Sequence, residues 1–388
     1  MKIHWRRLTA ALLLLLALLS VAAAEDEAKD IAADCKLTAS ANSKYRSRLL
    51  NTDFQRYWPC APGDILTVET PAGKPAQGIV VSFLGGVPSL TIESKGQVIG
   101  EYTETFIMNY IPFSEPAETF TITIGDGAED IRFNRLQVIS EGAVPAWVPR
   151  WERLEEPAEI MLVATHPDDE LLWFGGMLPT YAGEYQKKVL VVYMVGNSTY
   201  RRCELLAGLW TCGVRYYPEI SAFPDRSASS YESVLKLWGE QGAQEYVAEM
   251  IRKHQPAVVV TQDIHGEYGH AHHRVTVQAV IDAVTALAAD PAWDEPSAKL
   301  YGVWQPRKLY LHLWPEEQIT FDWQQPLAAF GGETSLSVTR RAFKLHASQQ
   351  TGKYKVSDSG RLDSRLFGLY WSSIGPDELH NDLLEHIE

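Results

Sequence analysis

The spacing of apolar residues changes near residue 150, and this change constrains the fold of the 388-residue chain more than any other feature. Before it, short runs rich in β-branched and aromatic residues alternate with Gly and Pro, which is typical of strands joined by turns. After residue 157, apolar runs alternate with stretches of helical spacing, which predicts a mostly parallel sheet covered by helices. We therefore expect a β-domain over residues 35–145 and an α/β domain over residues 157–388.

The first region has no convincing long helix. Its strand candidates are residues 65–69, 78–83, 89–93 and 119–124. Strands of this length and spacing predict an all-β sandwich or jelly roll. The stretch Val144–Pro149, which contains two Pro and one Trp, predicts a linker to the second region.

The second region begins with a continuous apolar run, Ile160–Ala164, which predicts a strand buried on both faces. Further strands are expected at residues 189–195, 257–260 and 308–311, and helices at residues 168–185, 200–210, 245–253 and 273–288. This order predicts a Rossmann-like, mostly parallel sheet with helices on both faces. In such folds the ligand site lies at the carboxyl ends of the strands.

The first 24 residues have the pattern of an export signal. Three cationic residues lie within the first seven positions, an apolar run from Leu8 to Val21 follows, and Ala22–Ala24 supplies small residues for cleavage. The pattern predicts a signal peptide over residues 1–24 and a secreted, extracytoplasmic protein. The apolar run is shorter than the roughly 20 residues of a membrane span. We expect no stable membrane insertion after cleavage, with an uncleaved N-terminal anchor as the alternative.

The charge and the cysteines constrain partners and bridges. A formal net charge of -14 disfavours nucleic acid and anionic membranes as partners. In an oxidising compartment Cys35 and Cys60 could pair. Cys203 and Cys212 lie nine residues apart in an expected helix, which separates them by about 13.5 Å, whereas a disulfide needs Cα atoms within roughly 7 Å. No bridge is expected there, and the sequence does not specify the oligomeric state.

Two groups of ionisable residues fall where strands are expected to end. The string THPDDE follows the first strand, and GEYGHAHH follows the strand at residues 257–260. His166 and Asp169 are three residues apart, as are His270 and His273, so each pair can share one side of a turn. Asp168 points elsewhere and is free to accept a proton from water.

These residue types favour a catalytic zinc site. Zinc binds His nitrogen and Asp oxygen and keeps one position open at catalytic sites. Magnesium and calcium prefer oxygen ligands alone, whereas iron(II) uses a similar set of two His and one carboxylate and stays as an alternative. Each string alone has a plainer explanation, as a helix cap or as a solvated loop. Both together at strand ends, about 100 residues apart, favour a metal site.

Three other histidines fit that site less well. His254 and His265 have no matching partner in the sequence, and we expect them at the surface or behind the ligands. His272 is adjacent to His273 and is expected to project away from the same metal.

The two strings resemble the paired motifs of the PIG-L/LmbE-like family of de-N-acetylases, whose members act on N-acetylglucosaminyl lipids and inositols and on similar N-acetyl sugars. The resemblance runs through most of residues 157–388. It implies that His166, Asp169 and His273 hold Zn²⁺, with Fe²⁺ as the alternative. It also implies that Asp168 is the general base.

The resemblance implies roles for further residues. His270 would stabilise the tetrahedral intermediate and assist the leaving amine, with protonated Asp168 as the other candidate donor, and Tyr268 would contact the oxyanion. Glu170 would organise the first loop. Arg201, in an R-x-x-E string ending at Glu204, and Asp225, in a Phe-Pro-Asp string, would contact substrate. The string AFKLHASQ at residues 342–349 is similar to a late helix of the family.

The chain departs from the family pattern beside the ligands. The family commonly has G-H-P-D-H, and here Ala271 and His272 replace the Pro and the Asp. Neither position is expected to bind the metal, but the surroundings of His270 change because a neighbouring carboxylate is lost.

The β-region loosely resembles a discoidin-type, galactose-binding-like module, through the strings at residues 49–60 and 131–140. Such modules often bind sugars through aromatic residues at loop tips. Tyr45, Tyr57 and Trp58 are the candidates here, but burial in the core is the favoured interpretation of all three.

The whole sequence predicts a secreted zinc-dependent hydrolase that removes acetyl groups from N-acetylated amino sugars of a glycan or glycoconjugate. Two alternatives stay open. One is an inactive carbohydrate-binding surface protein, and the other is a metal-dependent amidase or esterase with a non-sugar substrate.

Overall fold

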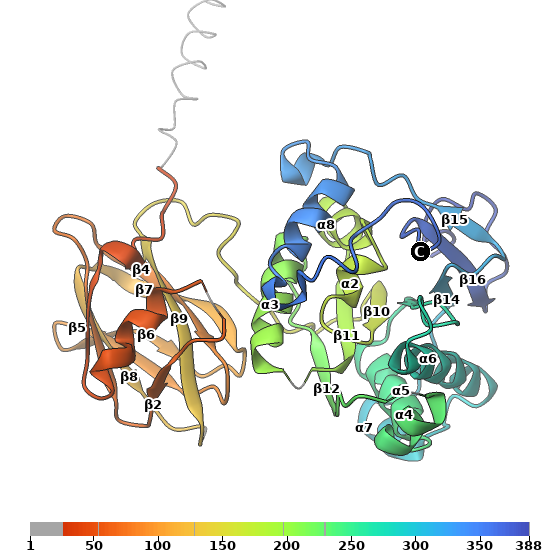
Figure 1. Cartoon of the computed structure of the whole chain (residues 1–388), viewed down its shortest axis with the longest axis horizontal. Helices are drawn as coiled ribbons and strands as arrows, with labels where there is room; N and C mark the ends of the chain where they lie inside the picture. Colours follow the sequence, from red (N-terminus) through yellow and green to blue (C-terminus); the bar gives the residue numbers. More distant parts are fainter. Residues whose placement is uncertain (1–25, 53, 128, 197, 229, 388) are drawn as a thin grey trace, which may run out of the picture.

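The structure is a computed structural model that describes residues 26–52, 54–127, 129–196, 198–228 and 230–387. The expected signal peptide lies outside the described residues. Two lobes, one all-β and one α/β, lie side by side and are joined by a single crossing of the chain (Figure 1). No helix of the described residues is long and apolar enough to cross a bilayer.

The first lobe is a sandwich of two antiparallel sheets, as expected. One sheet has the order β1-β3-β8-β5-β6 and the other has the order β2-β9-β4-β7. Side chains on β3 and β8 alternate between buried and less buried positions, so Leu66, Val68, Phe120 and Ile122 enter the core between the sheets. The strands are β1 Lys36–Ala39, β2 Trp58–Cys60, β3 Ile65–Glu69, β4 Ala76–Phe83, β5 Leu90–Ser94, β6 Gln97–Tyr102, β7 Met108–Ala117, β8 Thr119–Ile124 and β9 Ile131–Ser140.

The aromatic candidates of this lobe are mainly packing residues. Trp58 is fully buried in the sandwich core, as the favoured interpretation expected, and it is not a sugar contact at a loop tip. Tyr45 packs against the same core, and the Arg48 guanidinium lies 4.2 Å from its ring centroid. Tyr57 packs against the adjacent core cluster. The two short 3₁₀ helices of the lobe are η1 Ala32–Asp34 and η2 Ser43–Leu50.

The second lobe is built on a seven-stranded sheet with the order β12-β11-β10-β13-β14-β16-β15. The five strands from β12 to β14 are parallel, and β16 and β15 add antiparallel pairs at one edge. The lobe is therefore a mixed α/β unit with a mostly parallel sheet, and β10, β11, β13 and β14 are its four strands expected from the sequence, whereas β12, β15 and β16 were not expected. The strands are β10 Ile160–Ala164, β11 Val189–Val195, β12 Glu219–Phe223, β13 Val258–Thr261, β14 Lys308–His312, β15 Gln318–Thr320 and β16 Leu366–Ser372.

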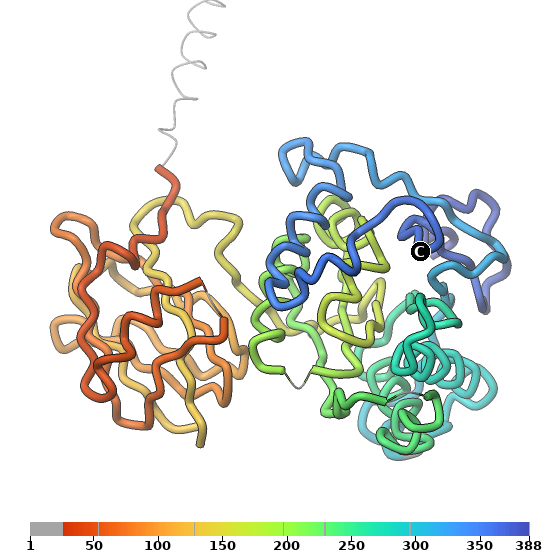
Figure 2. Tube along the Cα trace, viewed as in Figure 1, coloured from red at the N-terminus to blue at the C-terminus, as the bar shows by residue number. Residues whose placement is uncertain are grey.

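Helices cover both faces of this sheet. Ile160, Leu162 and Ala164 of β10 pack with apolar residues of α3 and α8. Met161 and Val163, which point to the other face, pack with α4, α5 and α6. Figure 2 follows the chain through the sandwich and the linker into this lobe. The helices are α2 Asp169–Leu172, α3 Thr199–Thr211, α4 Tyr231–Trp238, α5 Gly242–His254, α6 Ala271–Ala289, α7 Glu295–Tyr301 and α8 Ser335–Phe343, with short turns at η3 Pro179–Glu184, η4 Ala328–Phe330 and η5 Ala347–Gln349.

The helix expected over residues 168–185 is wrong in its extent. Helix α2 ends at Leu172, and η3 begins only at Pro179. Gly175, between them, has φ 53°, and a Cβ at this position would collide with Ser364 and Trp323. The close approach of the C-terminal segment therefore interrupts the helix, because only glycine fits this space.

The pairing of Cys35 and Cys60 that the sequence allowed is not formed. All four cysteines are unpaired. Cys35 precedes β1 in one sheet of the sandwich, whereas Cys60 ends β2 in the other sheet. Burial raises the pKa of both thiols, to about 11 and about 12 respectively. Cys203 lies within α3, and Cys212 is the residue that caps its C-terminal end. The two cysteines are not bridged, as expected.

Candidate metal centre and active site

The two ionisable strings meet because their strands are neighbours. Strand β10 pairs in parallel with β13, in the register Leu162–Val260. The loop after β10 leads into α2, and the loop after β13 leads into α6. Both loops therefore leave the sheet at the same edge. Thr165 and Gln262, the first residues beyond the two strands, are hydrogen bonded to each other through the Thr165 amide at 3.0 Å.

Three side-chain atoms converge at this edge. His166 Nδ1 lies 3.1 Å from Asp169 Oδ2 and 3.1 Å from His273 Nε2, and the Asp169 and His273 atoms are 3.2 Å apart. Nitrogen and oxygen ligands about 2.0–2.1 Å from a tetrahedral ion lie about 3.3–3.4 Å from one another. The triangle therefore has the size of one face of such a shell.

The donor set fits a cation rather than a hydrogen-bonded cluster. Two imidazole nitrogens and a carboxylate oxygen point at one another, and each can offer a lone pair. His273 is fully buried and Asp169 is 3% exposed, so both side chains are shielded from bulk solvent. The three residues that the sequence predicts as ligands are thus brought together by the fold.

The outward atoms of two ligands are held by residues that the sequence analysis gave no role. Glu267 Oε2 lies 2.8 Å from His273 Nδ1, which leaves Nε2 facing the centre. His312 Nδ1 lies 3.3 Å from the other oxygen of Glu267. Trp173 Nε1 donates to Asp169 Oδ1 at 2.7 Å and leaves Oδ2 for the centre. Glu267 belongs to the GEYGH string, and its place there was the one sequence signal that could have identified it as part of the site.

The buried charges tune these ligands. Burial by itself would raise the pKa of Asp169, but His273 and His166 outweigh it and hold the pKa well below its usual range. Burial would lower the pKa of His273, but the carboxylates of Asp169 and Glu267 raise it to about 10. The mutual attraction of these groups therefore keeps both side chains charged although they are buried.

Asp168 lies beside the ligands in a strained conformation. Its φ of 125° is in a region that residues other than glycine rarely adopt. The Glu170 carboxylate stabilises this turn by accepting from the Asp168 amide at 2.7 Å. Arg201 donates to Asp168 Oδ1 at 3.0 Å. Burial, together with Asp169, raises the pKa of Asp168 well above its usual value even though Arg201 lowers it.

His270 and Tyr268 form another side of the site. Their ring centroids are 5.6 Å apart, and His270 lies 4.7 Å from His273. Burial and the nearby His273 and His166 lower the pKa of His270 to about 3. Burial and Asp169 raise the pKa of Tyr268 above its usual value, so its phenol stays a hydrogen-bond donor at neutral pH.

A cavity of about 260 Å³ opens over the centre. Tyr354 stacks on Tyr268 with ring centroids 4.5 Å apart and meets Trp173 edge-on at 5.6 Å, which gives the cavity an aromatic wall. The sequence analysis did not find Tyr354, which follows η5. The lining residues are His166, Asp168, Asp169, Leu172, Trp173, Arg201, Asp225, Tyr268, His270, Gln349 and Tyr354.

The two expected substrate contacts also line this cavity. Arg201 lies between Asp168 and Asp225, at 3.0 Å and 4.0 Å. Asp225 Oδ1 is 3.7 Å from His166 Nε2. Glu204, one turn along α3 from Arg201, accepts from the Ser348 amide at 2.8 Å and so fixes η5 near the site.

His272 is not one of the three residues of the triangle, but it lies close to two histidines of the site. Its ring centroid lies 5.7 Å from that of His166 and 5.3 Å from that of His270. His272 lies in the first turn of α6, directly after the N-cap His270, whose backbone is extended and not helical. His265 is exposed at the surface, which is one of the two places where it was expected. The expectation for His254 is wrong, because this residue is buried at the end of α5, beside the start of β10, and its Nε2 lies 2.8 Å from Glu219 Oε1.

Residues 161–284 match the family model described as PIG-L, GlcNAc-PI de-N-acetylase. The chain contains a PIG-L domain. The match begins in β10, ends within α6 and includes both ionisable strings, so every residue of the proposed metal centre lies inside it.

Curated relatives match the same region. A 1D-myo-inositol 2-acetamido-2-deoxy-alpha-D-glucopyranoside deacetylase of Thermomonospora curvata is 32% identical over 184 residues, which cover 38% of this chain and 60% of that protein. The protein of the same description from Kineococcus radiotolerans is 25% identical over 234 residues, which cover 51% and 63%. The chain thus spans less than two thirds of the length of these relatives.

Among solved structures, the N,N'-diacetylchitobiose deacetylase of Pyrococcus horikoshii is 20% identical, with a TM-score of 0.36 over 50% of this chain and 73% of that chain. A Clostridium perfringens structure described as CpGH89CBM32-4 is 14% identical, with a TM-score of 0.24 over 29% and 94%. At these scores neither likeness bears on the fold or on the activity.

Proposed function

We propose that this protein is a secreted, zinc-dependent hydrolase that removes acetyl groups from N-acetylated amino sugars. The observation that carries the proposal is the triangle of His166 Nδ1, Asp169 Oδ2 and His273 Nε2, with separations of 3.1–3.2 Å beside the carboxylate of Asp168. The family match and the deacetylase descriptions of the relatives support the reaction type.

His166, Asp169 and His273 are the residues that would hold the metal. Two imidazoles and one carboxylate suit zinc, and iron(II) is the alternative with the same ligands. A bound divalent ion supplies Lewis acidity, which polarises an amide carbonyl and lowers the pKa of water. Glu267 and Trp173 fix the orientation of two of these ligands.

Asp168 is proposed as the general base. Its carboxylate lies beside Asp169 at the rim of the cavity and can take a proton from the attacking water. Arg201, at 3.0 Å, holds one oxygen of Asp168 and leaves the other for the water.

Tyr268 and His270 are proposed to serve the oxyanion and the leaving amine. The protonated phenol of Tyr268 is a donor toward developing negative charge. A neutral His270 can donate only its single N–H, so it suits a hydrogen bond to the tetrahedral intermediate better than transfer of a proton. Asp168, once protonated by the water, can supply the proton that the amine must receive.

The substrate class follows from the cavity and the relatives. Tyr354, Tyr268 and Trp173 offer flat apolar faces, and Arg201 and Asp225 offer polar contacts for hydroxyl groups. A pyranose ring presents both kinds of surface. We infer an N-acetylhexosamine unit, carried by a glycan or glycoconjugate, with the inositol glycoside that the relatives deacetylate as one member of the class.

The remaining assignments belong to the same proposal. The strand order β12-β11-β10-β13-β14 supports a Rossmann-like catalytic domain over residues 157–388. The sandwich supports a separate domain over residues 35–145, and carbohydrate binding by this domain is a further part of the proposal. Neither nucleic acid nor stable insertion into a membrane is part of the proposed function, and export rests on the signal pattern of residues 1–24.

The test is hydrolysis by the purified mature chain, first stripped of metal and then loaded with Zn²⁺ or Fe²⁺. N-acetylhexosamine glycosides, including chitooligosaccharides and an inositol glycoside, are incubated with each form, and acetate and free amine are both measured. Equal release of acetate and amine, dependent on the metal, supports the proposal. Hydrolysis confined to acetyl esters or to non-sugar amides favours the second alternative. No hydrolysis by any loaded form favours an inactive carbohydrate-binding protein.

A further inference from the structure

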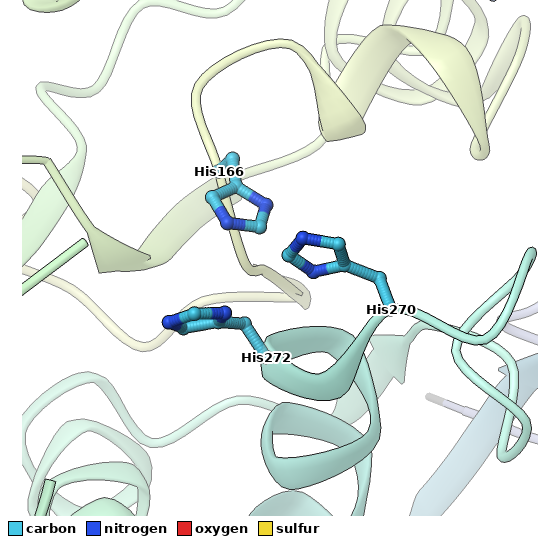
Figure 3. Close-up of side chains that lie close together, drawn as sticks. All are labelled: His166, His270 and His272. Carbon is cyan, nitrogen blue, oxygen red and sulfur yellow. The ribbon is translucent and has the colours of Figure 1, made fainter. Parts of the chain in front are cut away.

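A second group of metal-ligand side chains lies directly beside the proposed centre. His166, His270 and His272 offer nitrogen atoms that lie within 4.8 Å of one another. Figure 3 shows the three rings side by side, with His166 on the loop after β10 and the other two at the start of α6. Their centroids are 5.0–5.7 Å apart.

The hydrogen bonding of His272 is what points to a ligand. This side chain is 2% exposed, and neither of its ring nitrogens has a hydrogen-bond partner among the described residues. The Nδ1 atom of His270 is likewise buried without a partner. Buried polar groups without partners are costly, and each such group calls for an explanation. A cation bound by these nitrogens would compensate for their missing hydrogen bonds.

The geometry separates this group from the first centre. Nδ1 of His166 faces Asp169 and His273, so Nε2 is the atom that remains for the second group. Asp225 Oδ1 lies 3.7 Å from that Nε2 and adds a carboxylate to the rim. Two ligands of one ion lie at most about 4.2 Å apart, so small rotations of the rings would close the shell.

We propose that His166 Nε2, His270 and His272, with Asp225 at the rim, form a second binding site for a divalent late transition ion. Imidazole-rich shells favour zinc, copper and nickel over magnesium and calcium. An ion bound through Nε2 displaces the remaining N–H proton of His166 to solvent, so His166 bridges the two ions. The inference goes beyond the proposed function because the first centre needs neither His272 nor Asp225.

Occupation of the second site has a consequence for the first. His270 lines the substrate cavity, and a cation on its ring takes away the hydrogen bond that it would offer there. The second ion is therefore inhibitory. Catalysis would need one equivalent of zinc and would fall when a second equivalent binds.

The experiment is a zinc titration of the metal-free mature protein, followed by calorimetry and by metal analysis after gel filtration. The wild-type chain should bind two equivalents, and His272→Phe should bind one. Phenylalanine keeps a ring against Trp238, whose centroid lies 5.3 Å from that of His272, but removes both nitrogens. His265→Ala, which removes an exposed histidine nearby, should still bind two.

A second variant and a second readout guard against misfolding. His272→Ala should also bind one equivalent, and Co²⁺ absorption should lose only the component of the second ion. One equivalent in the wild type, or two in both His272 variants, overturns the inference. His273→Ala tests the first centre separately, because its loss of the first ion is independent of His272. In the deacetylation assay, excess Zn²⁺ should inhibit the wild type more than tenfold and His272→Phe little, each relative to its own activity at one equivalent.

Discussion

The carboxylate of Glu267 lies 2.8 Å from Nδ1 of His273, on the side of the imidazole ring opposite to His166 and Asp169. Burial would raise the pKa of Glu267, but its contacts with His273 and His312 lower the pKa. An ionised Glu267 accepts from Nδ1, so Nε2 is the nitrogen that would lose its proton to a metal. The proposed centre depends on this contact, although Glu267 meets the His273 ring on the side away from the triangle.

Replacement of Glu267 by Gln should weaken metal binding by about 10- to 100-fold, because a residue that orients a ligand is worth roughly that factor. Competition with a chromophoric chelator measures the affinity. Glu245→Gln, an exposed carboxylate on α5, is the control and should bind like the wild type. An unchanged affinity in Glu267→Gln would mean that His273 is oriented by other contacts.

Asp168→Asn should lower kcat by about 10²- to 10⁴-fold and leave the metal content unchanged, because the amide cannot accept the proton of water. His166→Ala should lose metal as well as activity. Metal analysis beside initial-rate kinetics separates the two effects. Retention of most of the activity in Asp168→Asn would show that another group is the base.

Tyr268→Phe should lower kcat by about 100- to 1,000-fold, or about 2.7–4 kcal/mol, with a smaller change in KM. The lost hydroxyl is a donor to charge that develops only in the transition state. Steady-state kinetics on an N-acetylhexosamine glycoside measures both constants. Tyr185→Phe, which removes the hydroxyl of an exposed tyrosine, is the matched control. Equal kcat values for both variants would remove Tyr268 from the oxyanion contact.

Glu219 should make stability depend on pH below 4.5. Burial opposes ionisation, but hydrogen bonds from His254 and Lys253 lower the pKa of Glu219 from 4.5 to about 2. A depressed pKa in the folded state stabilises the fold above pH 4.5, and this contribution is lost as the pH falls towards 2. We expect about 1–2 kcal/mol after screening by solvent. In urea unfolding between pH 4.5 and 2, the free energy of unfolding should change less for Glu219→Gln than for the exposed control Glu101→Gln. An identical pH profile would contradict the assignment.

Asp377→Asn should destabilise the α/β lobe by about 3–5 kcal/mol, because it breaks a buried ion pair and leaves a buried cation. Asp377 binds Lys308 Nζ and Tyr310 Oη, and the side chains of Asp377 and Lys308 are both fully buried. Chemical denaturation gives the free energy. The comparison is Glu69→Gln, which removes a pair with Lys36 that is exposed on the sandwich and should cost less than about 1 kcal/mol. Equal losses for the two variants would show that the pair on β14 is not structural.

The sequence by itself determined the two kinds of domain and the strands that lead into the site. The run Ile160–Ala164 is a strand buried on both faces, and the change of spacing near residue 150 separates a sandwich from an α/β unit. Local spacing also fixed which side chains leave the strands at β10 and β13, because apolar runs and the residues that follow them depend only on neighbours along the chain. The proposed roles of these residues stay predictions.

Only the tertiary structure decided which distant residues complete the site. Glu267 faces His273, Trp173 holds Asp169, and Tyr354 comes to the cavity from beyond η5. His272 turns toward His166, and Gly175 interrupts a helix where Ser364 approaches. Cys35 and Cys60 fall in different sheets. Each of these outcomes depends on the packing of segments far apart in the sequence, and the spacing of residues along a chain carries no information about such contacts.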